Sequence, residues 1–317
     1  MSNLATSIGN STSPGTPMEL VSMFTVLGIQ FWDPTLDQPV SDGLTVTAQL
    51  EDSSFPVITA LRTASRAYAF QGLPGLHDLE YPRVNSAQAS PPKSLRFVIT
   101  VSDSLKRFLA TVFTVELPLG YSGLFLSNRV GSPAAPNARA YLFSAPTRGI
   151  ATGNSVVRAD IWDRDKDQPA AFAALQLSID GVTQLWTGIA DDQGRLQLQF
   201  PSPLLQSLSL GSPPGSNQGA PSSVTWPISV KILYEPSQLL FPLAGLPDEP
   251  WPWNVTPSLK SILGAQSQAS IWQNESGPPG NEWTGEITYG TPLVLRTSSS
   301  DPTAASSVLM VSQITSP

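Results

Sequence analysis

Apolar and polar residues alternate with a period of two in many short runs of this chain. Such alternation is typical of half-buried β-strands, because successive side chains of a strand point to opposite faces. Pro, Gly, Asp or Ser bounds each run, as is usual for turns. Helical periodicity does not extend beyond about ten residues anywhere. We therefore predict an all-β protein, and the clearest strands are Leu44–Ala48, Phe97–Val101 and Val112–Val115.

Two segments are candidates for short helices. In Thr256–Leu263, a threonine stands at the N-cap position and Pro257 at the first helical position, where the missing N–H has no partner to lose. Ser104–Leu109 is the second candidate. Neither is long enough to change the predicted fold class.

One sequence frame occurs twice. FWDPTLDQPV and IWDRDKDQPA share the pattern W-D-x-x-x-D-Q-P, and their tryptophans lie 130 positions apart. The frame therefore places one set of residues opposite another, namely Trp32, Asp33, Asp37 and Pro39 opposite Trp162, Asp163, Asp167 and Pro169.

The same offset relates more of the chain. The alternating segment that ends at Phe70 falls opposite the one that ends at Phe200, and Leu95–Val101 falls opposite Thr225–Lys231. Agreement at three separate places predicts two homologous β-modules. The predicted organisation is a flexible tail (1–17), module one (18–121), a linker (122–148), module two (149–250) and a C-terminal β extension (251–317).

Several parts of this organisation carry further expectations. The linker contains a possible strand at Tyr141–Phe143, and strands are also expected at Ala269–Gln273, Trp283–Thr297 and Ser306–Ile314. These last three strands either form a third, smaller unit or add to module two. Polar stretches rich in Ser and Pro, at Pro82–Ser94 and Leu210–Ser223, predict an exposed loop at nearly the same place in each module.

The repeated frame has a mechanical interpretation. A strand ends in Trp-Asp, the tryptophan packs into the core, and the carboxylate of Asp33 or Asp163 accepts backbone N–H groups inside the turn. Proline at 39 or 169 then sets the backbone for entry into the next strand. This interpretation makes the frame a determinant of fold.

A calcium loop is the competing interpretation. Asp163, Asp165 and Asp167 are spaced like the start of an EF-hand, but Gln168 stands where that loop needs glycine and Ala174 where it needs glutamate. The first copy keeps only two of the carboxylates. A loose site that also uses Asp191 and Asp192 is the remaining form of this hypothesis, and otherwise no cofactor is expected.

A family resemblance rests on Thr187–Leu198, TGIADDQGRLQL. This segment resembles the strand pair T-G-x-A-D-x-x-G-x-x-x-L of carboxypeptidase regulatory-like modules, which are transthyretin-like β-sandwiches. The turn from Trp162 to Pro169 resembles the opening turn of that family, and Gly194 fits a hairpin position with positive φ. In the first copy, Thr63-Ala64 replaces Gln193-Gly194, so its turn must differ. The resemblance implies two tandem transthyretin-like or immunoglobulin-like sandwiches.

A second resemblance concerns biological context. The paired modules, with GLPGLHDLE at 72–80, RFVITVSD at 96–103 and YLFSAPTR at 141–148, resemble two-module proteins encoded beside phage-tail-like contractile injection systems in bacteria. This resemblance implies a non-enzymatic structural or accessory subunit, at the baseplate or elsewhere, present in several copies. Its partners would be other protein subunits, bound through edge strands, loops and tails. It would be made in the bacterial cytoplasm and assembled into a particle that is released or docked at a membrane.

Composition narrows the possible partners. A net charge of −7, without a basic stripe, argues against nucleic acid. No apolar run reaches the roughly 20 residues needed to cross a bilayer. The absence of cysteine removes thiol chemistry and disulfides.

Candidate catalytic chemistry is sparse. His77 is the only histidine, too few for a histidine-based zinc centre, and no G-x-S-x-G motif accompanies it. We interpret His77 as a loop residue bonded to a neighbour, and we predict no enzyme activity. The alternative function is carbohydrate binding by an exposed aromatic face of Trp251, Trp253, Trp272 and Trp283; otherwise, these side chains pack the C-terminal strands against module two.

Overall fold

A computed structural model describes residues 25–51, 55–80, 94–118, 124–126, 135–137, 140–203, 224–244, 252–299 and 306–314. The predicted all-β class is confirmed, since strands dominate these residues and their helices are short. No helix in these ranges is long and apolar enough to span a membrane. The predicted tail and the loop at 210–223 lie outside the described residues, as does the loop at 82–94 apart from its last residue.

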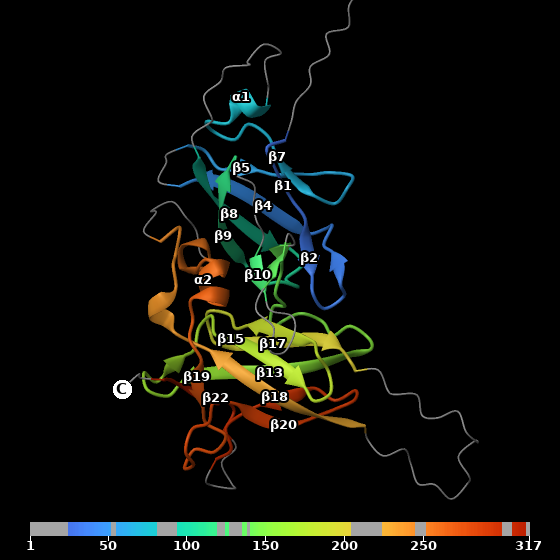
Figure 1. Cartoon of the computed structure of the whole chain (residues 1–317), viewed down its shortest axis with the longest axis vertical. Helices are drawn as coiled ribbons and strands as arrows, with labels where there is room; N and C mark the ends of the chain where they lie inside the picture. Colours follow the sequence, from blue (N-terminus) through green and yellow to red (C-terminus); the bar gives the residue numbers. More distant parts are fainter. Residues whose placement is uncertain are drawn as a thin grey trace, which may run out of the picture.

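The first half of the chain, residues 25–148, builds one end of an elongated molecule (Figure 1). Its largest sheet has the order β5-β4-β8-β9, and two smaller sheets have the orders β1-β7-β6 and β12-β2-β3. The elements are β1 (Leu27–Ile29), β2 (Phe31–Asp33), β3 (Gln38–Pro39), β4 (Leu44–Leu50), β5 (Ile58–Thr59), β6 (Leu61–Arg62), β7 (Tyr68–Phe70), α1 (His77–Glu80), β8 (Leu95–Asp103), β9 (Thr111–Leu117), β10 (Leu124–Leu126), β11 (Ala135–Asn137) and β12 (Ala140–Tyr141); β10 pairs with β11.

The second half, residues 149–314, builds the other end. One sheet has the order β16-β15-β18-β20, and the other has the order β14-β13-β22-β19, with β17 and β21 also paired to β13. The elements are β13 (Asn154–Asp163), β14 (Gln168–Pro169), β15 (Ala174–Ile179), β16 (Leu185–Ile189), β17 (Arg195–Pro201), β18 (Thr225–Leu233), η1 (Pro236–Gln238), η2 (Trp253–Val255), α2 (Leu259–Gly264), β19 (Ala269–Ile271), β20 (Trp283–Thr288), β21 (Leu293–Leu295) and β22 (Leu309–Gln313).

Strand register repeats between the two halves in the frame read from the sequence. The turn hairpin pairs Trp32 with Pro39 in the first half and Trp162 with Pro169 in the second, so both partners shift by 130 positions. The long pair β4–β8 likewise matches β15–β18, because Leu44↔Asp103 becomes Ala174↔Leu233. The frame therefore marks structurally equivalent hairpins.

One pairing departs from this frame. Leu27 in β1 faces Phe70, whereas its counterpart Val157 in β13 faces Leu198, so the register differs by two residues. A shift of two keeps the same side chains on the buried face, because side chains alternate with a period of two. The turns also differ as expected: Gly194 has φ +73, whereas Arg66 has φ +64 in the first half.

The C-terminal strands complete the second half. β20 extends the sheet at β18, while β21 and β22 run parallel to β13. Ile287, Leu295 and Val311 are buried in the second apolar core. Of the two arrangements open for residues 251–317, the structure therefore has the added strands.

The first half closes in a similar way. β12 runs parallel to β2, as β22 does to β13. Leu142 and Phe143 follow β12 and are buried in the first core. The end of the predicted linker 122–148 is therefore part of the first half.

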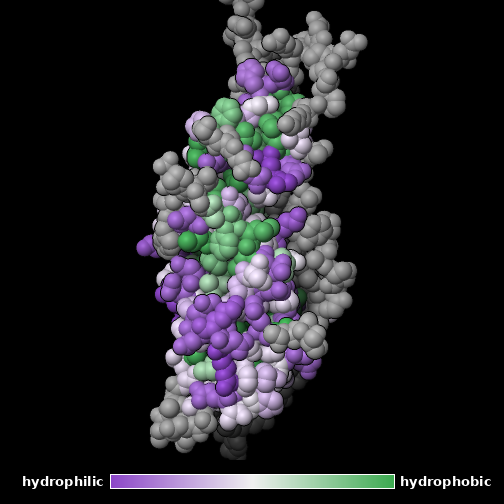
Figure 2. All heavy atoms as spheres, turned by 90° about the vertical axis from the view of Figure 1, so that its left-hand side faces the viewer, coloured by the Kyte–Doolittle hydropathy of each residue, from purple (hydrophilic) through white to green (hydrophobic). Residues whose placement is uncertain are grey.

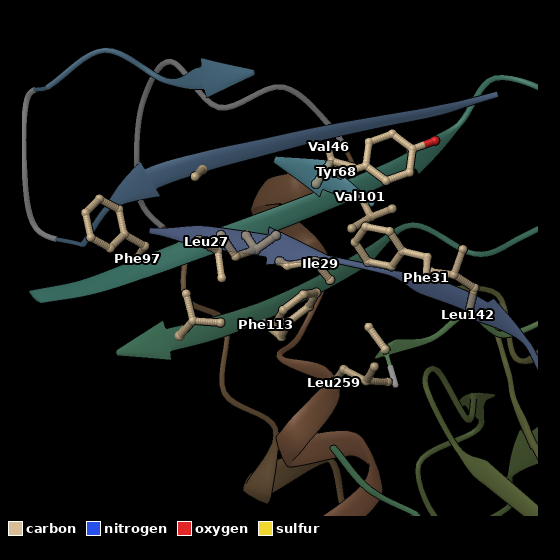
Figure 3. Close-up of a cluster of buried hydrophobic side chains, with 14 of the residues drawn as sticks. Leu27, Ile29, Phe31, Val46, Tyr68, Phe97, Val101, Phe113, Leu142 and Leu259 are labelled. Atoms are coloured by element: carbon tan, nitrogen blue, oxygen red, sulfur yellow. The ribbon is translucent and has the colours of Figure 1, made fainter. Parts of the chain in front are cut away.

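Residues of the second half enter the first core. Leu259 and Ile262, from α2, are buried among the first-half side chains, together with Ala174 and Ile189. Figure 3 shows Leu259 projecting from the helix toward Phe113. This packing joins the two halves through shared apolar contacts, as Figure 1 shows for the position of α2.

Both helix predictions need correction. α2 begins after Ser258, two residues later than predicted, because the Thr256 hydroxyl donates to the Pro252 carbonyl instead of capping the helix. Residues 104–106 form a turn, in which Lys106 has φ +54 and the Asp103 carboxylate accepts the Leu105 and Arg107 N–H groups, and Phe108 then forms a β-bridge with Ser144. Local hydrogen bonding by aspartate competes with helix formation.

Candidate functional site

The first copy of the repeated frame is a tight hairpin between β2 and β3. Asp33 is buried, and its carboxylate accepts the Thr35 N–H at 2.9 Å. The Trp32 indole N–H donates to the Asp37 carboxylate at 2.9 Å, across the turn. Asp37 itself has φ +48, a left-handed conformation that aspartate tolerates better than most residues.

The second copy has the same construction. Asp163 is fully buried and accepts the N–H groups of Asp165 and Lys166 at 3.1 and 3.2 Å. The Trp162 indole donates to Asp167, which has φ +49. The hydrogen bonds expected inside the turn are therefore confirmed in both copies.

The expectation for the tryptophans was wrong. Trp32 and Trp162 are half-buried and belong to neither apolar core. The carboxylate beside each ring is the buried group, and the ring lies over the turn. The indole N–H needs its aspartate partner there, which places the ring at the edge of the fold.

The calcium hypothesis finds no gathered ligand set. Asp163 uses one oxygen for the turn, and the other accepts the Tyr234 hydroxyl at 3.1 Å. Asp191 accepts the Gln193 and Arg195 N–H groups within its own turn. Among the described residues, no three histidine, aspartate or glutamate side chains group in a way that suits a metal ion.

The two buried aspartates differ in their charged neighbours. Asp33 forms an ion pair with Arg148, whose Nη1 and Nη2 donate to its two oxygens at 3.2 and 2.6 Å. The guanidinium also lies 4.9 Å from the centre of the Phe108 ring. Asp163 accepts the Tyr234 hydroxyl, with Lys166 Nζ 4.0 Å from the same oxygen, and burial together with this carboxylate raises the pKa of Tyr234 to about 12.

Arg148 stands at the point where the two halves meet. Its carbonyl accepts the Gln197 side-chain amide at 2.6 Å, and the Gln199 amide donates to Gly149. Thr35, in the first turn, donates through its hydroxyl to the Gln199 carbonyl at 3.2 Å. Sequence reasoning missed these residues, because no local pattern signals a contact between the first turn and β17.

One cavity at this junction, of about 480 Å³, lies beside β16. Residues 184–188 line it together with Gln197–Gln199 of β17, and Pro34, Tyr141 and Ser144 line it from the first half. Among the described residues of its lining, Asp37 is the only charged one. Such a lining suits hydrogen bonding and apolar contact with an uncharged ligand.

A second cavity, of about 470 Å³, lies between α2 and the first half. Phe108, Phe143 and Phe172 line it with Leu259, and the charged pair Asp191–Arg195 stands at its border. Figure 2 shows apolar residues gathered at mid-height on the side that carries α2, between polar regions. In the described residues that precede α2 in the chain, Leu240, Phe241 and Val255 are large apolar side chains exposed to solvent.

The tryptophans considered for carbohydrate binding do not form one face. Trp272 lies under the Arg164 guanidinium, 3.8 Å from the ring centre, and Trp283 packs against the second core. Trp253 instead packs against Val98 and Val112 of the first half. Trp251 lies outside the described residues.

His77 is exposed at the start of α1, with its Nδ1 3.9 Å from the Asp78 carboxylate. It is thus a helix residue, not the loop residue that was predicted. The buried acid of this region is Glu80, whose carboxylate accepts the Gly72 N–H at 2.9 Å and the Leu73 N–H at 3.3 Å. The Glu80 carboxylate thus holds the loop at Gly72 and Leu73 and has no histidine partner. This geometry supports a structural role for the acid.

No family model and no curated protein matches this chain.

Proposed function

We propose that this protein is a non-enzymatic structural or accessory subunit of a phage-tail-like contractile particle, which binds other subunits through its sheet edges. The observation that carries the proposal is the joint between the halves. Hydrogen bonds from the Gln197 and Thr35 side chains and a shared apolar core fix two sheet assemblies together, while edge strands stay unpaired within the described residues.

A fixed connection between the two sheet assemblies suits a subunit that contacts more than one neighbouring subunit. Two rigidly connected sheet assemblies present their edges at a constant distance and angle, which a repeating assembly with rotational symmetry requires. Unpaired strand edges offer rows of N–H and C=O groups to a neighbouring chain. Both features favour a part of an assembly over a free-standing catalyst.

The family resemblance supplies the context. Gly194 adopts the positive φ that the transthyretin-like hairpin needs, and the repeated frame builds equivalent turns in both halves. These points support the proposal of two transthyretin-like modules, of the kind encoded beside contractile injection systems. The position within the particle and the number of copies follow only from imaging.

Sedimentation of a native lysate tests this proposal. We expect the chain to pellet with sheath and tube proteins, as measured by mass spectrometry of the pellet. In a matched strain that lacks the sheath protein, the chain should move to the supernatant. If it stays with small proteins in both strains, the proposal is wrong, and a glycan array on the purified chain tests the carbohydrate-binding alternative.

A further inference from the structure

β16 is an edge strand whose free side can be assigned residue by residue. The Ala190 N–H donates to the Ala173 carbonyl, and the Asp180 N–H donates to the Pro227 carbonyl on the other side of β15. These bonds fix the alternation of the ladder, so Trp186 and Gly188 are bonded to β15. The main-chain groups of Leu185, Thr187 and Ile189 therefore point away from the sheet.

No described residue forms a ladder with that free side. The cavity of about 480 Å³ lies along it, lined by residues 184–188. Five residues of strand extend about 16 Å, at roughly 3.3 Å per residue. The free edge therefore borders a groove that fits a short extended segment.

Thr187 gives a second, independent sign of a missing partner. Its hydroxyl oxygen is buried and has no hydrogen-bond partner among the described residues. Buried polar atoms are nearly always paired, and an unpaired one calls for an explanation. Because Thr187 also lines the groove, a segment placed there would provide a donor or acceptor for this hydroxyl.

β16 packs closely on β17 at the wall of the groove, and the described residues of the lining are nearly all uncharged. The Trp186 ring packs on Phe200 with 4.8 Å between ring centres, which anchors β16 to the second core. Gly188 fits closely on β17, since an added Cβ would lie 3.3 Å from Leu198 Cβ. Asp37 is the one charged residue in the described lining, so a charged segment would lose hydration without a partner there for most of its length.

We propose that β16 binds an extended, uncharged segment of a partner chain by strand addition, through the main-chain groups of Leu185 and Thr187 and the Thr187 hydroxyl. That this partner is a particle subunit rests on the proposed function; the strand addition itself does not. Alternate residues of the added strand would face the groove, so a segment that alternates apolar and small polar residues fits best.

Hydrogen exchange with a defined peptide tests the strand addition. The probe is the acetylated and amidated hexapeptide ALQLSI, a copy of β15, which already pairs with the other edge of β16. We expect fast exchange at the Leu185 and Thr187 amides in the free chain, and at least tenfold slower exchange with saturating peptide. Slow exchange in the free chain, or no slowing by peptide, overturns the inference.

Matched proline variants locate the contact. Thr187→Pro removes an outward N–H from β16, and Glu286→Pro removes one from β20, the other edge of the same sheet. Only the first should abolish peptide binding. Thr187→Lys, which keeps the amide but adds a charge to the groove, serves if the proline variant does not fold; peptide binding unchanged by it overturns the inference.

The sedimentation assay separates this inference from the proposed function. If the wild-type chain pellets with particles and Thr187→Lys stays in the supernatant, β16 is a contact within the particle. If both pellet equally, the inference that β16 docks the partner is wrong while the proposed function stands. If neither pellets, the proposed function fails, and the peptide experiment alone decides the strand addition.

Discussion

Asp33 and Asp163 hold equivalent turns together, yet their second oxygens have different partners. Asp33 is 4% exposed and meets a guanidinium from the junction, whereas Asp163 is 0% exposed and meets the Tyr234 hydroxyl, with Lys166 Nζ 4.0 Å from the same oxygen. A buried carboxylate must be compensated by charge or hydrogen bonds. The first turn therefore depends on Arg148 at the junction between the halves, and the second depends on Tyr234, which directly follows β18.

Arg148→Ala should destabilise the protein by about 3–5 kcal/mol, because it leaves the Asp33 carboxylate buried without its counter-ion. Urea unfolding at neutral pH measures this change. The control is Lys231→Ala, which removes a half-exposed pair with Glu282 and should cost less than about 1 kcal/mol. Equal losses in the two variants would show that the buried pair has no special role.

Gly194→Ala and Gly181→Ala compare two glycines with nearly the same φ, +73 and +74. Both substitutions carry the left-handed penalty of about 1–2 kcal/mol. At Gly194 an added Cβ would also overlap the Ile161 carbonyl oxygen, whereas nothing lies within 4 Å at Gly181. We expect Gly194→Ala to be worse by a further 1–3 kcal/mol, roughly the cost of overpacking. Thermal melts of both variants measure the difference, and equal melting temperatures would contradict this assignment.

Tyr234 links stability to alkaline pH. Its pKa is raised to about 12 in the folded chain, from an ordinary value of 10.0, because of burial and the Asp163 carboxylate. The unfolded chain ionises first as pH rises, so stability present below pH 10 is lost between about pH 10 and 12, by roughly 2–3 kcal/mol. Tyr234→Phe lacks this titration but loses the hydrogen bond, worth about 1–2 kcal/mol at pH 8.

The stability difference between wild type and Tyr234→Phe should therefore narrow as pH rises from 8 to 11.5. Urea unfolding across this range measures it. Tyr289→Phe, which removes a hydroxyl from a half-exposed ring, is the control for the loss of a tyrosine hydroxyl. A stability difference between wild type and Tyr234→Phe that stays constant over this pH range would contradict the raised pKa of Tyr234.

At the scale of elements, the main role of α2 is to connect the two halves by packing into the first core. It has only six residues, Leu259–Gly264, and no side-chain cap, so its own helix propensity is too weak to hold it. Leu259 and Ile262 are buried in the first core, and Ser258 forms a bridge with Val112 of β9. Tertiary contacts with the first half therefore keep this segment helical.

Ile262→Ala should cost about 2–5 kcal/mol, because it opens a cavity in the core that the halves share. Lys260→Ala, at an exposed position of the same helix, is the control and should stay within about 0.5 kcal/mol. Urea unfolding, followed by tryptophan fluorescence, gives both values. A small effect at Ile262 would mean that α2 packs loosely on the first half.

At the scale of the whole molecule, the shared core predicts one cooperative unfolding transition. Side chains of both halves are buried together, and the hydrogen bonds from the Gln197 side chain to the Arg148 carbonyl and from the Thr35 hydroxyl to the Gln199 carbonyl cross the same junction. Calorimetry should give a single peak whose calorimetric and van't Hoff enthalpies agree. Two resolved peaks would show that the halves unfold independently and that the joint is weak.

Some features of this fold follow from local sequence. Alternation located β4, β8 and β9, and the repeated frame located two hairpins in matching register. Period and turn chemistry act over a few neighbouring residues, so they are readable without coordinates. The turn bonds of Asp33 and Asp163 are local in the same sense.

Other features required the tertiary structure. Which residue of the Trp-Asp pair is buried depends on the strand that covers the turn. The sequence Trp-Asp is the same whether the aspartate or the tryptophan is the buried one. The helix N-cap moved from Thr256 to Ser258 because a carbonyl at Pro252 competed for the hydroxyl. The candidate site at β16 arises because, among the described residues, Leu185–Ile189 pairs with a strand on one side only, which depends on strands distant in sequence.

The sequence by itself determined the strand class, the repeat and the chemistry of its turns, because each depends on residues within a few positions of one another. Only the tertiary structure decided that Arg148 neutralises Asp33, that α2 completes the first core and that β16 keeps one edge unpaired by the strands that the structure describes. These contacts join residues that are tens to over a hundred positions apart. Their free energy depends on how whole sheets pack, which no local pattern encodes.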